Sequence, residues 1–433
     1  MRGFFGLAVA AAAALVGSAL GRPIVAQAGD ISKIVITDKN TINGTLPYQP
    51  KIMNNPLRFQ LHNNTRNAGQ MYAYVTGRDV NDHVVLLTTS GQFYYPNPAG
   101  SPIPVAIPSN ANHAIPLNAA GSTTEIVVPD FISSARVWVS DGELKFFTLL
   151  AADGRVSLVE PSFANPQDPS ANQNWGFVEL TNNSGGIYAN LSFVDFVGMV
   201  MSMRLTLGSG EVQTVEGLAP GSVGLICDGM RAQAAIDGQP WDKMCVTRAD
   251  GTALRILAPN IYVASNPGAM ADYYTSYVDQ VWAKYTNEDL IIDTQGQWGQ
   301  VPCRVQGSDM VCRGDSITYP KPTIVDIWGC NSGPFANIGD ELHKAILARM
   351  CAAFHRTELL LPGGNVTPSL GSPAYYTVDP TSHYARLVHE HETDQKGYAF
   401  SYDDVNPHGE NAAGVVAGPN PQLLEIFIEG GLN

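Results

Sequence analysis

Hydrophobic and polar positions alternate in short runs through the first half of the chain, separated by clusters of Asn, Gly and Pro. The runs cover residues 33–37, 57–61, 71–76, 83–87, 124–128, 136–139 and 144–150. Runs of this length and spacing, with no helical periodicity between them, are typical of an antiparallel β-sandwich or barrel.

Helical patterns appear in the second half. Aromatic and aliphatic residues of 272–287 recur at the i, i+3, i+4 spacing of one helix face, which predicts an amphipathic helix whose aromatic stripe packs in the core. A second helix is predicted over 340–356, with Asp340 and Glu341 in its first turn and His355 and Arg356 in its last, as the helix dipole favours. Weaker patterns predict helices over 230–236 and 382–390, and residues 423–428 return to strand character.

These patterns predict a mainly β fold in two parts. The first is a β domain that is discontinuous in sequence, formed by residues of about 29–200 and C-terminal strands. The second is a mixed α/β lobe formed by residues of about 200–395. A length of 433 residues is ample for two such parts.

The first 28 residues have the features of a secretory signal peptide. Arg2 is followed by an uncharged apolar run and by the small-residue motif Ala26-Gln27-Ala28. A membrane anchor is the alternative, although the run is short for a span. Cleavage would change the formal charge from −14 to −16, because it removes Arg2 and Arg22 and no acidic residue. We therefore expect a secreted, extracellular protein that acts as a monomer and does not bind a membrane after cleavage. Nucleic acid is not an expected partner, because an acidic surface repels phosphate backbones.

The six cysteines are even in number, which after a signal peptide indicates disulfides. Cys303 and Cys312 flank a segment with a Gly-Ser-Asp turn, so a bridge across a hairpin is expected there. For the rest we expect Cys227–Cys245 and Cys330–Cys351, among the fifteen connectivities that six cysteines allow. A zinc site is the alternative, but no Cys-x-x-Cys motif occurs.

Two acidic residues, Glu179 and Asp195, lie in strand-like runs of the segment 175–197 among aromatic and β-branched residues. A carboxylate in such surroundings is costly unless it is paired or used, and burial raises a carboxyl pKa as a general acid requires. A loop centred near Ile187 would place the two acids directly opposite each other. A turn over 183–186 would leave them several residues out of register. The alternative is two unrelated acids on solvated strand faces.

Other motifs are weaker. His389-Glu390-His391-Glu392 lacks the second histidine at i+4 that a zinc protease helix needs. Arg313-Gly314-Asp315 resembles an adhesion tripeptide, beside a cysteine that favours a structural turn. Trp175, Trp298 and Trp328 could stack on sugar rings, with core packing as the default. Glycosylation sequons occur at Asn43, Asn63, Asn182, Asn190 and Asn365.

Five segments, in order along the chain, resemble glycoside hydrolase family 64, the β-1,3-glucanases with a thaumatin-like barrel. They are 72–87 (YAYVTGRDVNDHVVLL), 175–197 (WGFVELTNNSGGIYANLSFVDFV), 329–335 (GCNSGPF), 348–354 (ARMCAAF) and 383–386 (HYAR) through 397–407 (GYAFSYDDVNP). The resemblance covers nearly the whole chain after residue 28.

The resemblance implies a thaumatin-like β domain and a mixed α/β lobe with a wide groove between them, and hydrolysis of β-1,3-glucan with inversion and without a cofactor. It assigns Glu179 as general acid and Asp195 as general base, about 6.5–9.5 Å apart as inversion requires. It points to Thr181, Asn183, Tyr188 and Asp403 as sugar contacts. Tyr188 stands where the family tends to carry tryptophan. The rival hypothesis is a non-catalytic glucan-binding or cell-wall protein on the same barrel, which would not need two acids in its groove.

Overall fold

The computed structural model describes residues 55–66 and 69–432. The predicted signal peptide, the predicted strand 33–37 and the sequon at Asn43 lie outside these residues. The disulfides Cys227–Cys245, Cys303–Cys312 and Cys330–Cys351 all form, which confirms the expected connectivity.

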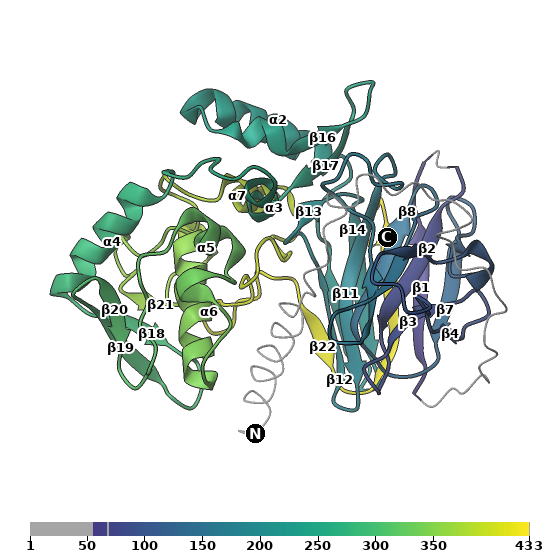
Figure 1. Cartoon of the computed structure of the whole chain (residues 1–433), viewed down its shortest axis with the longest axis horizontal. Coiled ribbons are helices and arrows are strands. Elements are labelled where there is room, and N and C mark those ends of the chain that lie inside the picture. The colour runs from purple at the N-terminus through teal and green to yellow at the C-terminus, as the bar shows by residue number, and fades with distance from the viewer. Residues whose placement is uncertain (1–54, 67–68, 433) are drawn as a thin grey trace.

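Two large sheets form one end of the molecule (Figure 1). The first has five strands, in the spatial order β15 (Val212–Val215), β14 (Met201–Leu207), β23 (Pro421–Ile428), β1 (Leu57–Asn63) and β7 (Thr123–Val128). The second is built from β22 (Val416–Gly418), β12 (Gly186–Leu191), β11 (Trp175–Asn183), β8 (Ile132–Ser140), β2 (Tyr72–Arg78), β3 (Val84–Leu87) and β4 (Phe93–Tyr94), with β6 (Ile115–Pro116) also paired to β2. Apart from the parallel pair β1–β23, every pairing in these two sheets is antiparallel.

The C-terminal strands return to these sheets. β23 lies between β14 and β1, and β22 pairs with β12. The β region also extends past residue 200, because β14 and β15 join the five-stranded sheet. A small sheet of β10 (Val156–Val159), β9 (Phe147–Leu150) and β5 (Val105–Ala106) completes this end.

The other end is a lobe that combines helices with a smaller sheet (Figure 1). A four-stranded sheet of β20 (Asp309–Cys312), β19 (Gln300–Gln306), β18 (Leu290–Asp293) and β21 (Val366–Thr367) lies there. The helices of this lobe are α4 (Thr275–Asn287), α5 (Ile324–Gly329) and α6 (Glu341–His355), with 3-10 turns η5 (Gly333–Phe335) and η6 (Ser372–Ala374). The buried face of α4 holds the predicted aromatic stripe, which confirms its role in core packing.

A third group of elements lies between the two ends or above them. It contains α2 (Ser222–Asp237), α3 (Pro259–Ser265), α7 (His383–His391), the turn η4 (Pro240–Met244) and a sheet of β13 (Phe196–Val197), β17 (Ala253–Leu257) and β16 (Cys245–Thr247). The remaining short helix, η3 (Ser109–Ala111), belongs to the β end. The described chain therefore has a mainly β fold, as the sequence predicted.

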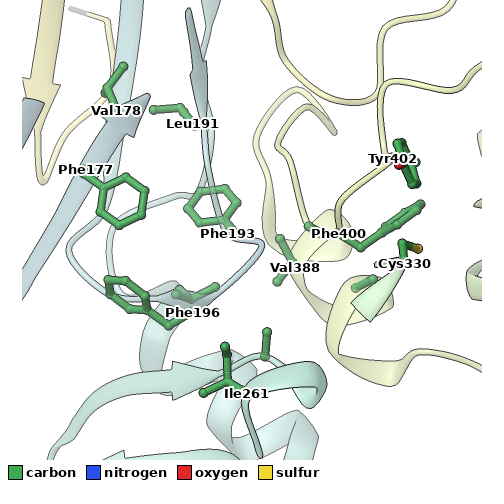
Figure 2. Packing of buried hydrophobic residues seen from close by; sticks show 14 of the residues in the cluster. Phe177, Val178, Leu191, Phe193, Phe196, Ile261, Cys330, Val388, Phe400 and Tyr402 are labelled. Carbon is green, nitrogen blue, oxygen red and sulfur yellow. The ribbon is translucent and has the colours of Figure 1, made fainter. Parts of the chain in front are cut away.

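One hydrophobic core runs through both ends. It joins Phe177 of β11 and Phe193 and Phe196 beyond β12 to Val388 of α7 and to Phe400 (Figure 2). Because the apolar side chains of both ends pack into one cluster, the segment after β12 is fixed between them. That segment carries Asp195.

Candidate active site

Glu179 lies near the middle of β11, an interior strand of the eight-stranded sheet. Its register partners are Arg136 on β8 and Asn190 on β12. The β11–β12 hairpin turns at Asn183–Gly186, which is the second of the two registers that the sequence left open. Glu179 is therefore not opposite Asp195, and its side chain keeps 29% of its surface exposed.

Asp195 lies in a loop, which corrects the expectation that it sits on a strand. β12 ends at Leu191, and β13 begins at Phe196 in a different sheet. The alternating pattern continues past Leu191, but the backbone turns away there. The side chain of Asp195 is 7% exposed.

Long-range hydrogen bonds hold this loop in place. The Phe193 N–H donates to the Tyr398 carbonyl at 2.8 Å, and the Tyr384 hydroxyl of α7 donates to the Phe193 carbonyl at 2.5 Å. The Ala258 N–H donates to the Asp195 carbonyl at 3.0 Å. Elements remote in sequence thus position Asp195, while the hairpin positions Glu179.

Arg136 brings the two acids together. Its Nη2 lies 2.9 Å from Glu179 Oε1 and 3.9 Å from Asp195 Oδ2. These two carboxyl oxygens can therefore be no farther apart than the two distances combined, 6.8 Å. The structure thus brings the two acids together through a third side chain rather than across a hairpin.

A third carboxylate, Glu160, meets the same guanidinium just after β10. Arg136 Nη1 donates to Glu160 Oε2 at 2.5 Å. Burial raises the pKa of Glu160, Arg136 lowers it, and the charges of Glu179 and Asp195 raise it again, so that it ends above its ordinary value. Sequence reasoning missed both Glu160 and Arg136, because each lies at least 19 residues from the acid pair in the sequence.

Two of the expected sugar-contacting residues lie beside Glu179. Thr181 and Tyr188 face each other across the hairpin. The Thr181 hydroxyl accepts a hydrogen bond from the Ser134 N–H. Burial raises the pKa of the Tyr188 hydroxyl, and the nearby charges of Asp404 and Glu179 raise it further. Asn183 lies apart from them at the exposed turn, where its side-chain oxygen accepts from the Gly185 N–H.

Asp403 is placed differently from the expectation that it contacts sugar. Its side chain is fully buried, and its carboxylate binds Arg356 at 2.9 Å and His389 at 2.9 Å. His389 also contacts Glu392 at 2.8 Å, so the histidine of the His-Glu-His-Glu motif serves an internal ion-pair network. A side chain without exposed surface cannot contact a substrate in this conformation, and we therefore assign Asp403 a structural role.

No cluster of metal-ligating residues occurs within residues 55–66 and 69–432. In the same part of the chain, no helix is both long and apolar enough to cross a membrane.

The remaining motifs are also structural. Asp315 of the Arg-Gly-Asp tripeptide is buried against His343 and Tyr319, which removes the adhesion hypothesis. Trp175 and Trp328 are core residues, whereas Trp298 is 37% exposed. The sequon asparagines Asn63, Asn182 and Asn190 are buried and have no room for a glycan in the folded protein, and Asn365 is half-buried.

Comparison with known proteins identifies the family. The model of a glycoside hydrolase family 64 β-1,3-glucanase matches residues 55–428. This chain belongs to glycoside hydrolase family 64.

Two curated relatives of this chain are named glucan endo-1,3-β-glucosidase, one from Cellulosimicrobium cellulans and one from an Arthrobacter species. Each is 30% identical over 375 residues, which are 84% of this chain. The chain spans 64% of the length of these relatives, less than two thirds.

Solved structures agree with the family assignment. A laminaripentaose-producing β-1,3-glucanase in complex with laminaritetraose is 27% identical, with a TM-score of 0.76, covering 86% of this chain and 98% of that one. A family 64 β-1,3-glucanase domain from Clostridium beijerinckii shares the fold at 21% identity and a TM-score of 0.67, covering 89% of this chain and 100% of that one.

One further residue of this family 64 chain lies near the site. Asp404, next to the buried Asp403, is close enough to Tyr188 to raise the pKa of its hydroxyl. Burial raises the pKa of Asp404 itself, while Tyr398 and Arg349 lower it. The C-terminal segment thus brings an acid to the sheet face that carries Glu179. The local sequence does not indicate which of the two adjacent acids, Asp403 or Asp404, lies near the site.

Proposed function

We propose that this chain is a glycosidase that hydrolyses β-1,3-glucan, with Glu179 as general acid and Asp195 as general base. The observation that carries the proposal is the meeting of these two acids at Arg136 in a chain that the family model matches from 55 to 428. The curated relatives are named glucan endo-1,3-β-glucosidases, and we propose the same activity for this chain.

The proposed reaction inverts the anomeric carbon. Asp195 takes a proton from water as the water oxygen bonds to the anomeric carbon. The glycosidic C–O bond breaks, and the leaving oxygen takes the proton of Glu179. Inversion requires carboxyl groups about 6.5–9.5 Å apart. The 6.8 Å limit on one pair of their oxygens overlaps the lower end of this range.

The proposed substrate site is a groove between a thaumatin-like β domain and the helical lobe. Tyr188 and Thr181 on the hairpin would contact sugar rings beside Glu179, with Asp404 opposite them. Support comes from the closeness of Tyr188 to both Glu179 and Asp404, whose charges both raise the pKa of its hydroxyl. The 27% identical neighbour was solved with laminaritetraose, an oligosaccharide of this linkage class.

We also propose that the protein is secreted and acts as a monomer. Three disulfides form in the structure, and disulfides persist in oxidising compartments outside the cytosol. The N-terminal sequence of protein collected from culture medium would test secretion, with cleavage after residue 28 as the expected result. Analytical ultracentrifugation would test the monomer.

The test of function is proton NMR of the anomeric signals while the purified protein acts on laminarin. We expect the α-anomer to appear first with the wild type. Glu179→Gln and Asp195→Asn should each lower kcat by about 10²-fold or more, because each loses a positioned proton donor or acceptor. Far-UV circular dichroism should remain unchanged in both variants.

Other outcomes are equally informative. If the β-anomer appears first, the assigned roles of the two acids are wrong. If the wild type binds laminarin without releasing reducing ends, the protein is a glucan-binding module on the same fold.

A further inference from the structure

Three carboxylates converge on the single guanidinium of Arg136. We propose that Arg136 is a positioning residue for Glu179 and Asp195, and that Glu160 is the counter-charge that leaves Glu179 able to hold its proton. This inference rests on the proposed function and adds two residues to its site.

The hydrogen bonds of Arg136 are directed at one oxygen of Glu179. Both Nε and Nη2 donate to Oε1, at 3.1 and 2.9 Å. Arg136 thus fixes the carboxyl group by Oε1 and leaves Oε2 as the oxygen that would carry the transferable proton. A planar guanidinium can set an orientation in this way, whereas a lysine ammonium is a point charge without a fork.

Arg136 is itself held rigidly. Its guanidinium lies 4.3 Å from the ring centre of Phe177 and 5.5 Å from that of Trp138. Its backbone pairs with Glu179 in the interior of the eight-stranded sheet. Burial lowers the pKa of Arg136, but Glu160, Glu179 and Asp195 together raise it by more, so that the group stays cationic.

An uncompensated cation at this place would work against the proposed reaction. It would favour the ionised form of Glu179, whereas a general acid must carry a proton. Glu160 supplies the compensating charge through its contact with Nη1. Two further titratable groups that face the acids are the hydroxyls of Tyr188 from β12, near Glu179, and Tyr384 from α7, near Asp195, and burial keeps both neutral by raising their pKa.

The test compares the pH profile of kcat/KM on laminarin for the wild type, Glu160→Gln and Arg136→Met. Removal of the negative charge in Glu160→Gln should stabilise ionised Glu179, so the alkaline limb should move down by about one pH unit. Removal of the positive charge in Arg136→Met should move the same limb up. A profile for Glu160→Gln that coincides with the wild-type profile would overturn the proposal.

Two further variants guard against a loss of structure. Arg136→Lys keeps the charge and loses the fork, so we expect kcat to fall about 10-fold with KM nearly unchanged and the alkaline limb in place. Glu425→Gln is the matched control, because Glu425 also contacts an arginine (Arg204, 3.6 Å) but belongs to the five-stranded sheet. Its pH profile should coincide with that of the wild type.

A second readout does not depend on activity. The carboxyl ¹³C signal of Glu179 can be titrated in glutamate-labelled protein and assigned by its absence in Glu179→Gln. We expect its midpoint to be lower in Glu160→Gln than in the wild type. If the wild type releases no sugar, the proposed function fails, and this titration still decides the role of Glu160. An unmoved midpoint rejects that role even in an active enzyme.

Discussion

Carboxylates that look alike in the sequence have opposite roles in the structure. Asp403 and Asp404 are neighbours, yet Asp403 is sealed between Arg356 and His389, while Asp404 acts on Tyr188. Burial raises the pKa of Asp403, but His389 and Arg356 lower it to about 2. Burial lowers the pKa of His389, but Glu392 and Asp403 raise it to about 10. The charges within this network stabilise each other.

Substitution of Asp403 by Asn should separate its structural role from the substrate-binding role that the sequence suggested. It leaves Arg356 buried without its counter-ion, which should cost about 3 kcal/mol of unfolding free energy. Urea unfolding measures this loss, and KM for laminarin should stay near the wild-type value in the folded fraction. A raised KM with unchanged stability would instead support the hypothesis that Asp403 contacts the sugar.

The same variant has a signature in pH. Because the pKa of Asp403 is depressed, its stabilising contribution is present above its ordinary value of 3.8 and is lost as the pH falls through about 2. Asp403→Asn should remove this part of the acid-side loss of stability. The unfolding free energies of variant and wild type should therefore converge as the pH falls from 4 toward 2.

At the scale of elements, the sequence predicted best where local signals agree. Helix α6 was predicted to within a residue at each end, because Asp340 caps its first turn and a continuous apolar stripe follows. Helix α2 was recognised only over 230–236, although it begins at Ser222. Its Gly229 weakens the local pattern, and the packing of α2 explains this residue, since a Cβ there would lie 2.6 Å from Leu387 of α7.

Removal of the α6 cap is a test at this scale. The Asp340 carboxylate accepts a hydrogen bond from the His343 N–H at 3.0 Å. Asp340→Ala should lower the unfolding free energy by about 1 kcal/mol, which a thermal melt would show as a decrease of about 1 °C and urea unfolding would measure directly. Asp340→Asn retains a good cap and should stay close to the wild type. Equal losses in both variants would mean that the charge, rather than the cap, matters.

At the scale of the whole molecule, the acid pair is assembled by elements that lie far apart in the sequence. The local pattern of 175–197 revealed both acids but placed Asp195 on a strand, because its alternation continues past the true end of β12. The turn at Leu191 depends on Tyr398, Tyr384 and Ala258, which are 60 or more residues distant in the sequence. Contacts of that range leave no trace in a local pattern, and Arg136 and Glu160 escaped notice for the same reason.

Tyr384→Phe tests whether the hydrogen bond between Tyr384 and the loop sets the position of Asp195. The substitution removes the hydroxyl that donates to the Phe193 carbonyl, two residues before Asp195, and leaves the buried ring in place. Tyr285→Phe is its matched control, since that buried hydroxyl donates to the Leu359 carbonyl at 2.8 Å in the helical lobe. Each should lose about 1 kcal/mol of unfolding free energy. Only Tyr384→Phe should lower kcat on laminarin, by about 10-fold, because a small displacement of a catalytic group is costly. Equal kcat values in the two variants would show that the loop keeps Asp195 in place without this bond.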